Sequence, residues 1–147
     1  MAATPEQNKR VVARLYEEVG NQGRLEVLDE ITWPDHIEHN PFPGQAQGAE
    51  GLKQRISMVR AAFNPTFTID HLIAEGDLVA AMWTNHGTHA GDWMGVAATG
   101  ASVSVRGVDI HRMRDGRLAE HWDVVDVSDF LLRTGALRLP GAAAGAA

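Results

Sequence analysis

The stretch SVSVRGVDIHRMRDGRLAEHWDVVDV, residues 102–127, determines the fold class that we expect for this chain. On both sides of Asp115-Gly116, polar and apolar residues alternate, which is the pattern of two half-buried strands. An Asp-Gly pair is favoured in tight type I′ turns. The sequence therefore predicts a β-hairpin whose strands cover residues 102–114 and 117–127.

Titratable groups gather on one face of this hairpin. His121 and Asp123 are two residues apart, so their side chains point to the same side of the strand. The turn brings them near Asp109 and His111, and we expect Asp109 to share the face of Asp123, although a one-residue shift in register would reverse this. Burial raises the pKa of a carboxyl group, so a cavity on this face would suit proton transfer by Asp123.

The other face of the last strand supports a competing interpretation. It is expected to carry Leu118, Trp122 and Val124, which are apolar. If these residues form the core, then His121 and Asp123 face solvent and have no catalytic role.

The remainder of the chain supplies further strands and the helices that cover them. Alternating residues predict strands over 66–74 and 78–90, joined by a turn at Gly76-Asp77. A capping signal at Thr4-Pro5, followed by apolar residues at helical spacing, predicts a helix that ends near Gly20. Further helices are predicted around 25–31, 52–63 and 129–134, whereas the proline-rich segment 33–48 is expected to be irregular.

Helices followed by an antiparallel meander indicate an α+β fold. We expect a cone-shaped α+β barrel, in which the N-terminal helices cover a strongly curved antiparallel sheet. A single domain is predicted over residues 1–138, because a chain of 147 residues can bury one core. Residues 139–147, rich in alanine and glycine, are predicted to be a disordered tail.

The composition excludes several classes of protein. Cysteine is absent, so disulfides, thiolate nucleophiles and cysteine-containing zinc sites are excluded. The net charge is −6 and the basic residues are scattered, which argues against a nucleic-acid partner. Neither a secretion signal nor a run of roughly 20 apolar residues is evident, so we predict a cytoplasmic protein without a membrane partner.

The histidines do not form a metal-binding pattern. His36 and His39 lie between prolines, where a helix that would align them is not expected. His86 and His89 would point to opposite faces of a strand. We therefore predict that the protein binds no metal.

Several stretches together carry a family resemblance. They are HIEHNPFP (36–43), GAEGLKQRI (48–56), IAEGDLVAAMWTNHGTHAGDWMG (73–95), TG (99–100) and GVDIHRMRDGRLAEHWDVVD (107–126). With these stretches the chain resembles the SnoaL-like polyketide cyclases, which share the cone fold of the nuclear-transport-factor-like superfamily. The resemblance implies a cofactor-independent intramolecular aldol condensation that closes a ring of an aromatic polyketide. Asp123 matches the general acid/base of the family, with His121 beside it in the pocket.

The resemblance also suggests which residues contact the substrate. His39 matches a polar pocket position, and His111 is expected beside the catalytic groups. Trp33, Phe42 and Trp83 are candidates for stacking on a flat polycyclic ligand, with a core position as the alternative for Trp83.

Asp109 stands where anthracycline cyclases tend to carry histidine, which leaves the substrate and the reaction open. We expect Asp109 to remain neutral and to donate a hydrogen bond to an enolate oxygen.

The resemblance further implies a homodimer or homotetramer that forms through the outer face of the sheet. Leu118, Trp122 and Val124 are the apolar candidates for this contact.

Two other functions remain open. The first is an epoxide hydrolase or isomerase of the same fold; the hydrolases use an Asp-Arg-Asp arrangement, and here Arg106 and Arg112 are expected to face away from Asp109. The second is a small-molecule binding module without catalytic activity.

Overall fold

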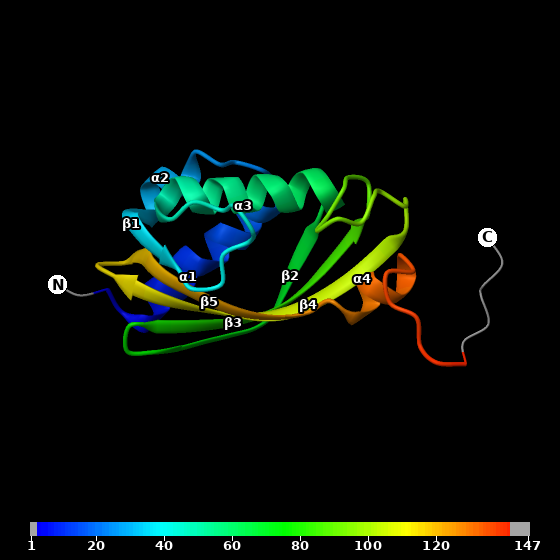
Figure 1. The fold of residues 1–147 in the computed structure, drawn as a ribbon. Coiled ribbons are helices and arrows are strands. Elements are labelled where there is room, and N and C mark those ends of the chain that lie inside the picture. The colour runs from blue at the N-terminus through cyan, green and yellow to red at the C-terminus, as the bar shows by residue number, and fades with distance from the viewer. Residues whose placement is uncertain (1–2, 142–147) are drawn as a thin grey trace.

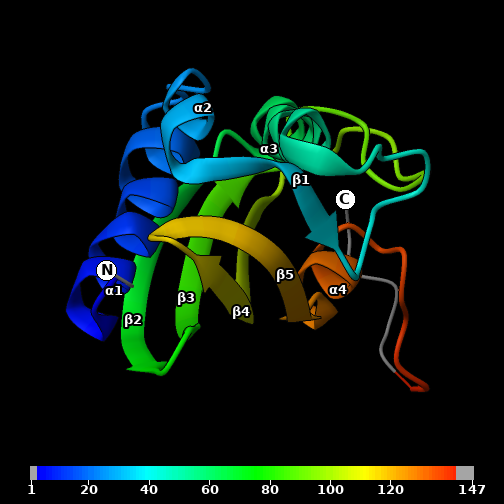
Figure 2. The same cartoon turned by 90° about the vertical axis from the view of Figure 1, so that its left-hand side faces the viewer.

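The structure is a computed structural model that describes residues 3–141. Its five-stranded sheet has the order β1-β5-β4-β3-β2, and helices α1, α2 and α3 lie along one side of the strongly curved strands (Figures 1 and 2). The strands are β1 (Thr32–Glu38), β2 (Thr66–Glu75), β3 (Leu78–Thr88), β4 (Ser102–Arg114) and β5 (Arg117–Asp126). The helical elements are α1 (Pro5–Arg14), the π-helical segment η1 (Leu15–Asn21), α2 (Val27–Ile31), α3 (Gly48–Phe63) and α4 (Ser128–Arg133).

The predicted α+β fold is confirmed, although the sheet is open rather than closed into a barrel. Strands β1 and β2 form its two edges and do not pair with one another. Residues 142–147 of the predicted tail lie outside the described residues, and 139–141 form neither helix nor strand.

The hairpin of β4 and β5 has the predicted turn. Asp115 and Gly116 have φ values of 50° and 75°, the left-handed conformation that a type I′ turn requires at both positions. Next to the turn Met113 pairs with Leu118. Beyond this pair the register shifts by one residue, because Arg112 pairs with Glu120 and leaves Ala119 as a β-bulge.

This bulge decides which side chains of β5 face inward. Leu118 is completely buried in the core, although the alternation of the sequence predicted it on the outer face with Trp122. That prediction was wrong because the extra residue at Ala119 reverses the alternation. His121 therefore faces inward with Leu118, whereas Val124 is 78% exposed on the outer face.

The segment expected to be irregular contains strand β1. It pairs in parallel with β5, matching Ile37 with Glu120 and Glu38 with His121. Pro34 had suggested a loop, but β1 is an edge strand and its pairing is interrupted between Thr32 and Ile37, where a proline is tolerated. The sheet is therefore mixed, with one parallel pair.

The helices begin and end near the predicted positions. Thr4 and Gln7 form the capping box of α1, and Asn64 ends α3 in the left-handed conformation at φ 44°. After Arg14 the first helix continues as η1, whose wider turns bury Tyr16 and Val19. In the described part of the chain, no helix has both the length and the apolar character needed to cross a membrane.

Two groups of buried apolar side chains hold the helices on the sheet. The larger group joins α1, η1 and α2 to β3, β4 and β5 through residues such as Val12, Leu28, Val79 and Leu118, all fully buried. The smaller one packs Phe63 of α3 and Phe130 of α4 against Val103. Burying a side chain of this size contributes about 1.5 to 3 kcal/mol, so these contacts fix the position of α3 above the sheet.

Gly107 of β4 makes room for Trp83 of β3, with which it pairs. A Cβ atom at position 107 would lie only 2.5 Å from the Trp83 ring. We expect Gly107→Ala to lower the free energy of unfolding by about 1 to 3 kcal/mol, because overpacking displaces the indole. Urea denaturation measures this change.

Arg106→Ala is the control, because Arg106 is the exposed neighbour of Gly107. A surface substitution of this kind changes stability by about 0.5 kcal/mol or less. If both variants unfolded at the wild-type urea concentration, the close packing of Trp83 against β4 would be contradicted.

Candidate active site

A cavity of about 280 Å³ lies between the curved sheet and the helices η1 and α3. Most of its walls are apolar, formed for example by Phe67, Trp83 and Val105. Met94 and Val127 also line it and are 50% and 41% exposed, so they mark its mouth. Four titratable residues of β4 and β5 line this apolar space, namely Asp109, His111, His121 and Asp123.

The register of the hairpin brings these four residues together. Asp109 pairs with Asp123 across β4 and β5, and His111 pairs with His121 one step deeper. The prediction that Asp109 and Asp123 share a face is therefore confirmed. The competing interpretation, in which His121 and Asp123 face solvent, is wrong, since the side chain of Asp123 is only 11% exposed and that of His121 only 6%.

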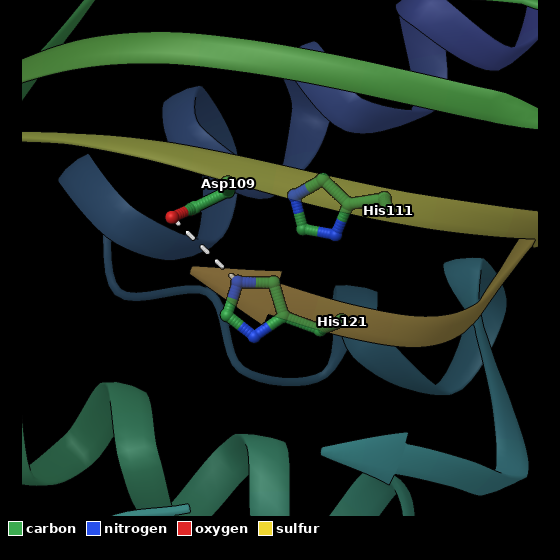
Figure 3. Close-up of side chains that lie close together, drawn as sticks. All are labelled: Asp109, His111 and His121. Atoms are coloured by element: carbon green, nitrogen blue, oxygen red, sulfur yellow. Dashed lines mark ion pairs between the residues drawn. The ribbon is translucent and has the colours of Figure 1, made fainter. Parts of the chain in front are cut away.

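His121 lies between two buried carboxylates. Its Nδ1 atom is 2.7 Å from Oε2 of Glu38. Its Nε2 atom is 3.6 Å from Oδ1 of Asp109, and Figure 3 shows this second ion pair. Burial lowers the pKa of His121, but these two carboxylates outweigh burial and raise its pKa to about 9. His121 is therefore an imidazolium at neutral pH.

The positive charge on His121 keeps both neighbouring carboxyl groups ionised. Burial raises the pKa of Asp109, but His121 outweighs burial and lowers the pKa to about 2. The same balance lowers the pKa of Glu38. Tyr16 donates a hydrogen bond of 2.5 Å to the second oxygen of Asp109. Asp109 is thus an ionised acceptor, not the neutral donor that we expected from sequence.

Asp123 is in a different electrostatic environment. Burial raises its pKa, and the opposing effects of Arg55 and His121 do not cancel this increase. Arg55 of α3 forms an ion pair with Asp123, and its second terminal nitrogen lies 3.6 Å from Glu38. The guanidinium also sits 3.9 Å from the ring centre of Phe42. Of these three carboxyl groups, Asp123 alone has a raised pKa.

The structure brings some of the predicted substrate contacts to the cavity and not others. Phe42, Trp83 and His111 line it. His39 instead stacks on Trp122 outside, with ring centres 4.3 Å apart. The reason is that His39 directly follows strand β1 and continues its alternation, in which His36 and Glu38 are buried and Ile37 is exposed.

Trp33 also lies away from the cavity. Its ring packs beneath the guanidinium groups of Arg114 and Arg117, at 4.3 and 5.1 Å from the ring centre. The indole nitrogen donates to the backbone oxygen of Arg114. Trp33 therefore packs against the turn end of the β4–β5 hairpin, outside the cavity.

Sequence reasoning missed four polar residues that line the cavity or bond to its histidines. His36 and Glu38 alternate with outward-facing residues in β1, a signal that the neighbouring prolines concealed. Tyr16 has the helical spacing of its apolar neighbours Val12 and Val19, so the sequence pattern does not distinguish it from a core residue. Arg55 lies on the same face of α3 as Leu52 and Ile56, and a charge within an apolar stripe was the sign that pointed to it.

Asp109, His111 and His121 also satisfy the spacing of a metal site. Each offers a ligand atom, and these atoms lie within 4.8 Å of one another. A metal ion would have to displace the proton that Glu38 and Asp109 hold on His121, because an imidazolium nitrogen has no free electron pair to donate. We assign no ion to this cluster, and the absence of a metal remains a prediction.

Comparisons with known proteins agree with this fold. The family model of the SnoaL-like polyketide cyclases matches residues 10–132. Nogalonic acid methyl ester cyclase of Streptomyces nogalater is 29% identical over 120 residues, which cover 78% of this chain and 88% of that protein. The chain therefore belongs to the SnoaL-like polyketide cyclase family.

Solved structures show the same architecture. TsrD from Streptomyces laurentii superposes with a TM-score of 0.83 at 28% identity, covering 92% of this chain and 99% of that one. IdmH from Streptomyces antibioticus gives a TM-score of 0.75 at 33% identity, covering 88% and 99%.

The charge on His121 has a consequence for stability. A histidine whose pKa rises on folding contributes stability that is fully present below its unfolded value, 6.5, and is lost as the pH rises through about 9. We expect the wild type to lose on the order of 1 to 3 kcal/mol more than His121→Gln between pH 6.5 and 9.5. Urea unfolding at a series of pH values measures this difference.

His86→Gln is the matched control, because His86 is exposed on β3. It should follow the wild-type curve. Parallel curves for the wild type and His121→Gln would show that His121 does not carry the buried charge.

Proposed function

We propose that this protein catalyses a cofactor-independent intramolecular aldol condensation of an aromatic polyketide, with Asp123 as the general base. The observation that carries the proposal is the contrast among three neighbouring carboxyl groups, of which Asp109 and Asp123 line the cavity. Asp109 and Glu38 are held ionised by His121, whereas burial raises the pKa of Asp123. Environments that separate carboxyl pKa values in this way distinguish the acid/base group from the groups that stay charged.

In the proposed reaction, one proton moves from the substrate to Asp123 and later returns to the product. Asp123 takes a proton from a carbon between two carbonyl groups, which leaves an enolate. The enolate carbon attacks a second carbonyl of the same molecule, forming the ring bond and an alkoxide. Asp123 returns its proton to the alkoxide, so the enzyme ends the cycle unchanged.

The charged neighbours of Asp123 stabilise the enolate in this scheme. The Arg55 guanidinium touches Asp123, and the His121 imidazolium lies two residues away on the same face of β5. Fixed positive charges in an apolar site stabilise a developing oxyanion more strongly than in water. Asp109 would act indirectly by keeping His121 charged. The cavity contributes by folding the substrate so that its reacting carbons meet.

Asp123→Asn tests the base directly, because the amide keeps the shape of the side chain and cannot accept the proton. We expect the rate of cyclisation of nogalonic acid methyl ester, the substrate named for the S. nogalater relative, to fall by about 10²-fold or more. Chromatography with mass detection would follow the cyclised product.

Asp126→Asn is the control on the same strand, since Asp126 is exposed and bonds Ser128 rather than lining the cavity. It should retain the wild-type rate. Turnover by Asp123→Asn at the rate of the control would refute the assignment of the base.

One observation favours the second candidate function, epoxide hydration. The arginine that appeared to be missing from the strands is supplied by α3, where Arg55 contacts both Asp123 and Glu38. Oxygen-18 from labelled water would enter a diol product only if this reaction occurs. A binding module would instead return every ligand unchanged.

We also propose a homodimer formed through the outer face of the sheet, where Met82, Val108 and Val124 lie on adjacent strands in register. They are 39%, 39% and 78% exposed. Helices α1 to α3 lie on the other side of the sheet (Figure 2), so this apolar strip is open to a second copy. A tetramer and the cytoplasmic location remain predictions from the sequence.

Val108→Glu places a charge in the centre of this strip. We expect it to convert dimers into monomers, as measured by light scattering after gel filtration, because a charge without a partner cannot be buried at low cost. Thr68→Glu, an exposed position on β2 outside the strip, is the control and should remain dimeric. A monomeric wild type would contradict the proposal.

A further inference from the structure

Buried polar atoms without a partner are concentrated in the wall of the cavity. In the described part of the chain, nine buried side-chain nitrogen and oxygen atoms have no hydrogen-bond partner. Six of them belong to residues that line the cavity: both ring nitrogens of His36, both of His111, the indole nitrogen of Trp83 and the amide oxygen of Asn85. Buried polar atoms without a hydrogen-bond partner destabilise a protein and are rare, so their clustering here points to a ligand that supplies the missing partners.

His36 and His111 lie at the closed end of the cavity. His111 lies two residues from Met113, which pairs with the fully buried Leu118. The ring of His111 stacks on that of His121, with ring centres 5.0 Å apart. In β1, Glu38 pairs with His121, so His36 lies further from the mouth, toward Leu118. Both histidines are only 2% exposed. A ligand that reaches them has already passed Asp123.

The charges around these two histidines define the group that they can accept. Burial, followed by the charge on His121, lowers the pKa of His36 to about 4 and that of His111 to about 3. Each ring is therefore neutral and offers one donor and one acceptor. The neighbouring charges are mixed, because the His121 imidazolium lies between the ionised Glu38 and Asp109, so neither an anionic nor a cationic group meets charges of only the opposite sign. A hydroxyl group, which both donates and accepts, matches the pair.

We propose that His36 and His111 recognise a neutral hydroxyl group, phenolic or enolic, at the inner end of the substrate. The inference rests on the proposed function in one respect, because it specifies which aromatic polyketides the cavity accepts. These carry a hydroxyl group on the ring that lies at the closed end of the cavity, and their reacting carbon lies nearer the mouth, beside Asp123. Trp83 and Asn85, on the β3 wall, can pair with further oxygen atoms along the same molecule.

Binding of an unreactive pair of probes tests the proposal without turnover. 2-Naphthol and 2-methylnaphthalene have the same shape and differ in one hydroxyl group. We expect the wild type to bind 2-naphthol more tightly, and His111→Leu and His36→Leu each to reduce that preference by about tenfold or more. Calorimetry or quenching of tryptophan fluorescence gives the two dissociation constants.

Two controls separate this outcome from others. His39→Leu changes an exposed histidine outside the cavity and should keep the wild-type preference. Because neither probe can cyclise, the preference is measured without turnover, so a failure of the proposed cyclisation would leave this result intact. Because leucine removes unpaired nitrogens, the His36 and His111 variants should unfold at or above the wild-type temperature, whereas a purely structural histidine would lower it.

Three results would overturn the proposal. A preference ratio that is unchanged in both leucine variants would show that the ring nitrogens bond only to buried water. Variants that lose stability while the ratio stays at its wild-type value would assign both histidines to packing. Equimolar Zn²⁺ that raises the unfolding temperature of the wild type but not of His111→Leu would assign the nitrogens to a metal.

Discussion

A buried positive charge held between two buried negative charges organises the inside of this protein. Moving the His121 imidazolium out of water is costly, and the cost is offset only because Glu38 and Asp109 lie on either side of it. The three groups come from β5, β1 and β4, and Tyr16 of η1 completes the chain of contacts. Removing one partner would leave the others uncompensated, so the edge strand, the hairpin and the first helix depend on each other.

The same charge separates the roles of the acidic residues. By holding its two neighbours ionised, His121 leaves Asp123 as the cavity carboxyl group whose affinity for a proton increases on burial. Arg55 limits that increase and keeps a cation next to the proposed base. The resemblance to the SnoaL-like family and the electrostatics of this chain both support the proposal that Asp123 is the base.

Sequence alone predicted the strands of the hairpin, its type I′ turn and the shared face of Asp109 and Asp123, because alternation and an Asp-Gly pair are local signals. It failed where tertiary contacts overrule local ones. Pro34 concealed β1, since only pairing with β5 makes that segment a strand. The contacts of Glu38, Arg55 and Tyr16 with the hairpin could not be predicted, because segments far apart in the sequence meet only in the folded protein.

The extra residue at Ala119 determines which side chains of β5 line the cavity. In an uninterrupted hairpin, Trp122 would stand opposite Asp109, and the polar set of β5 would look out into solvent. The one extra residue therefore moves the polar side chains of β5 from the solvent-exposed face to the buried face, while the turn and the residue pairs next to it are unchanged. A single insertion or deletion near this position is therefore enough to exchange the side chains that the last strand presents to the cavity for those that it presents to solvent.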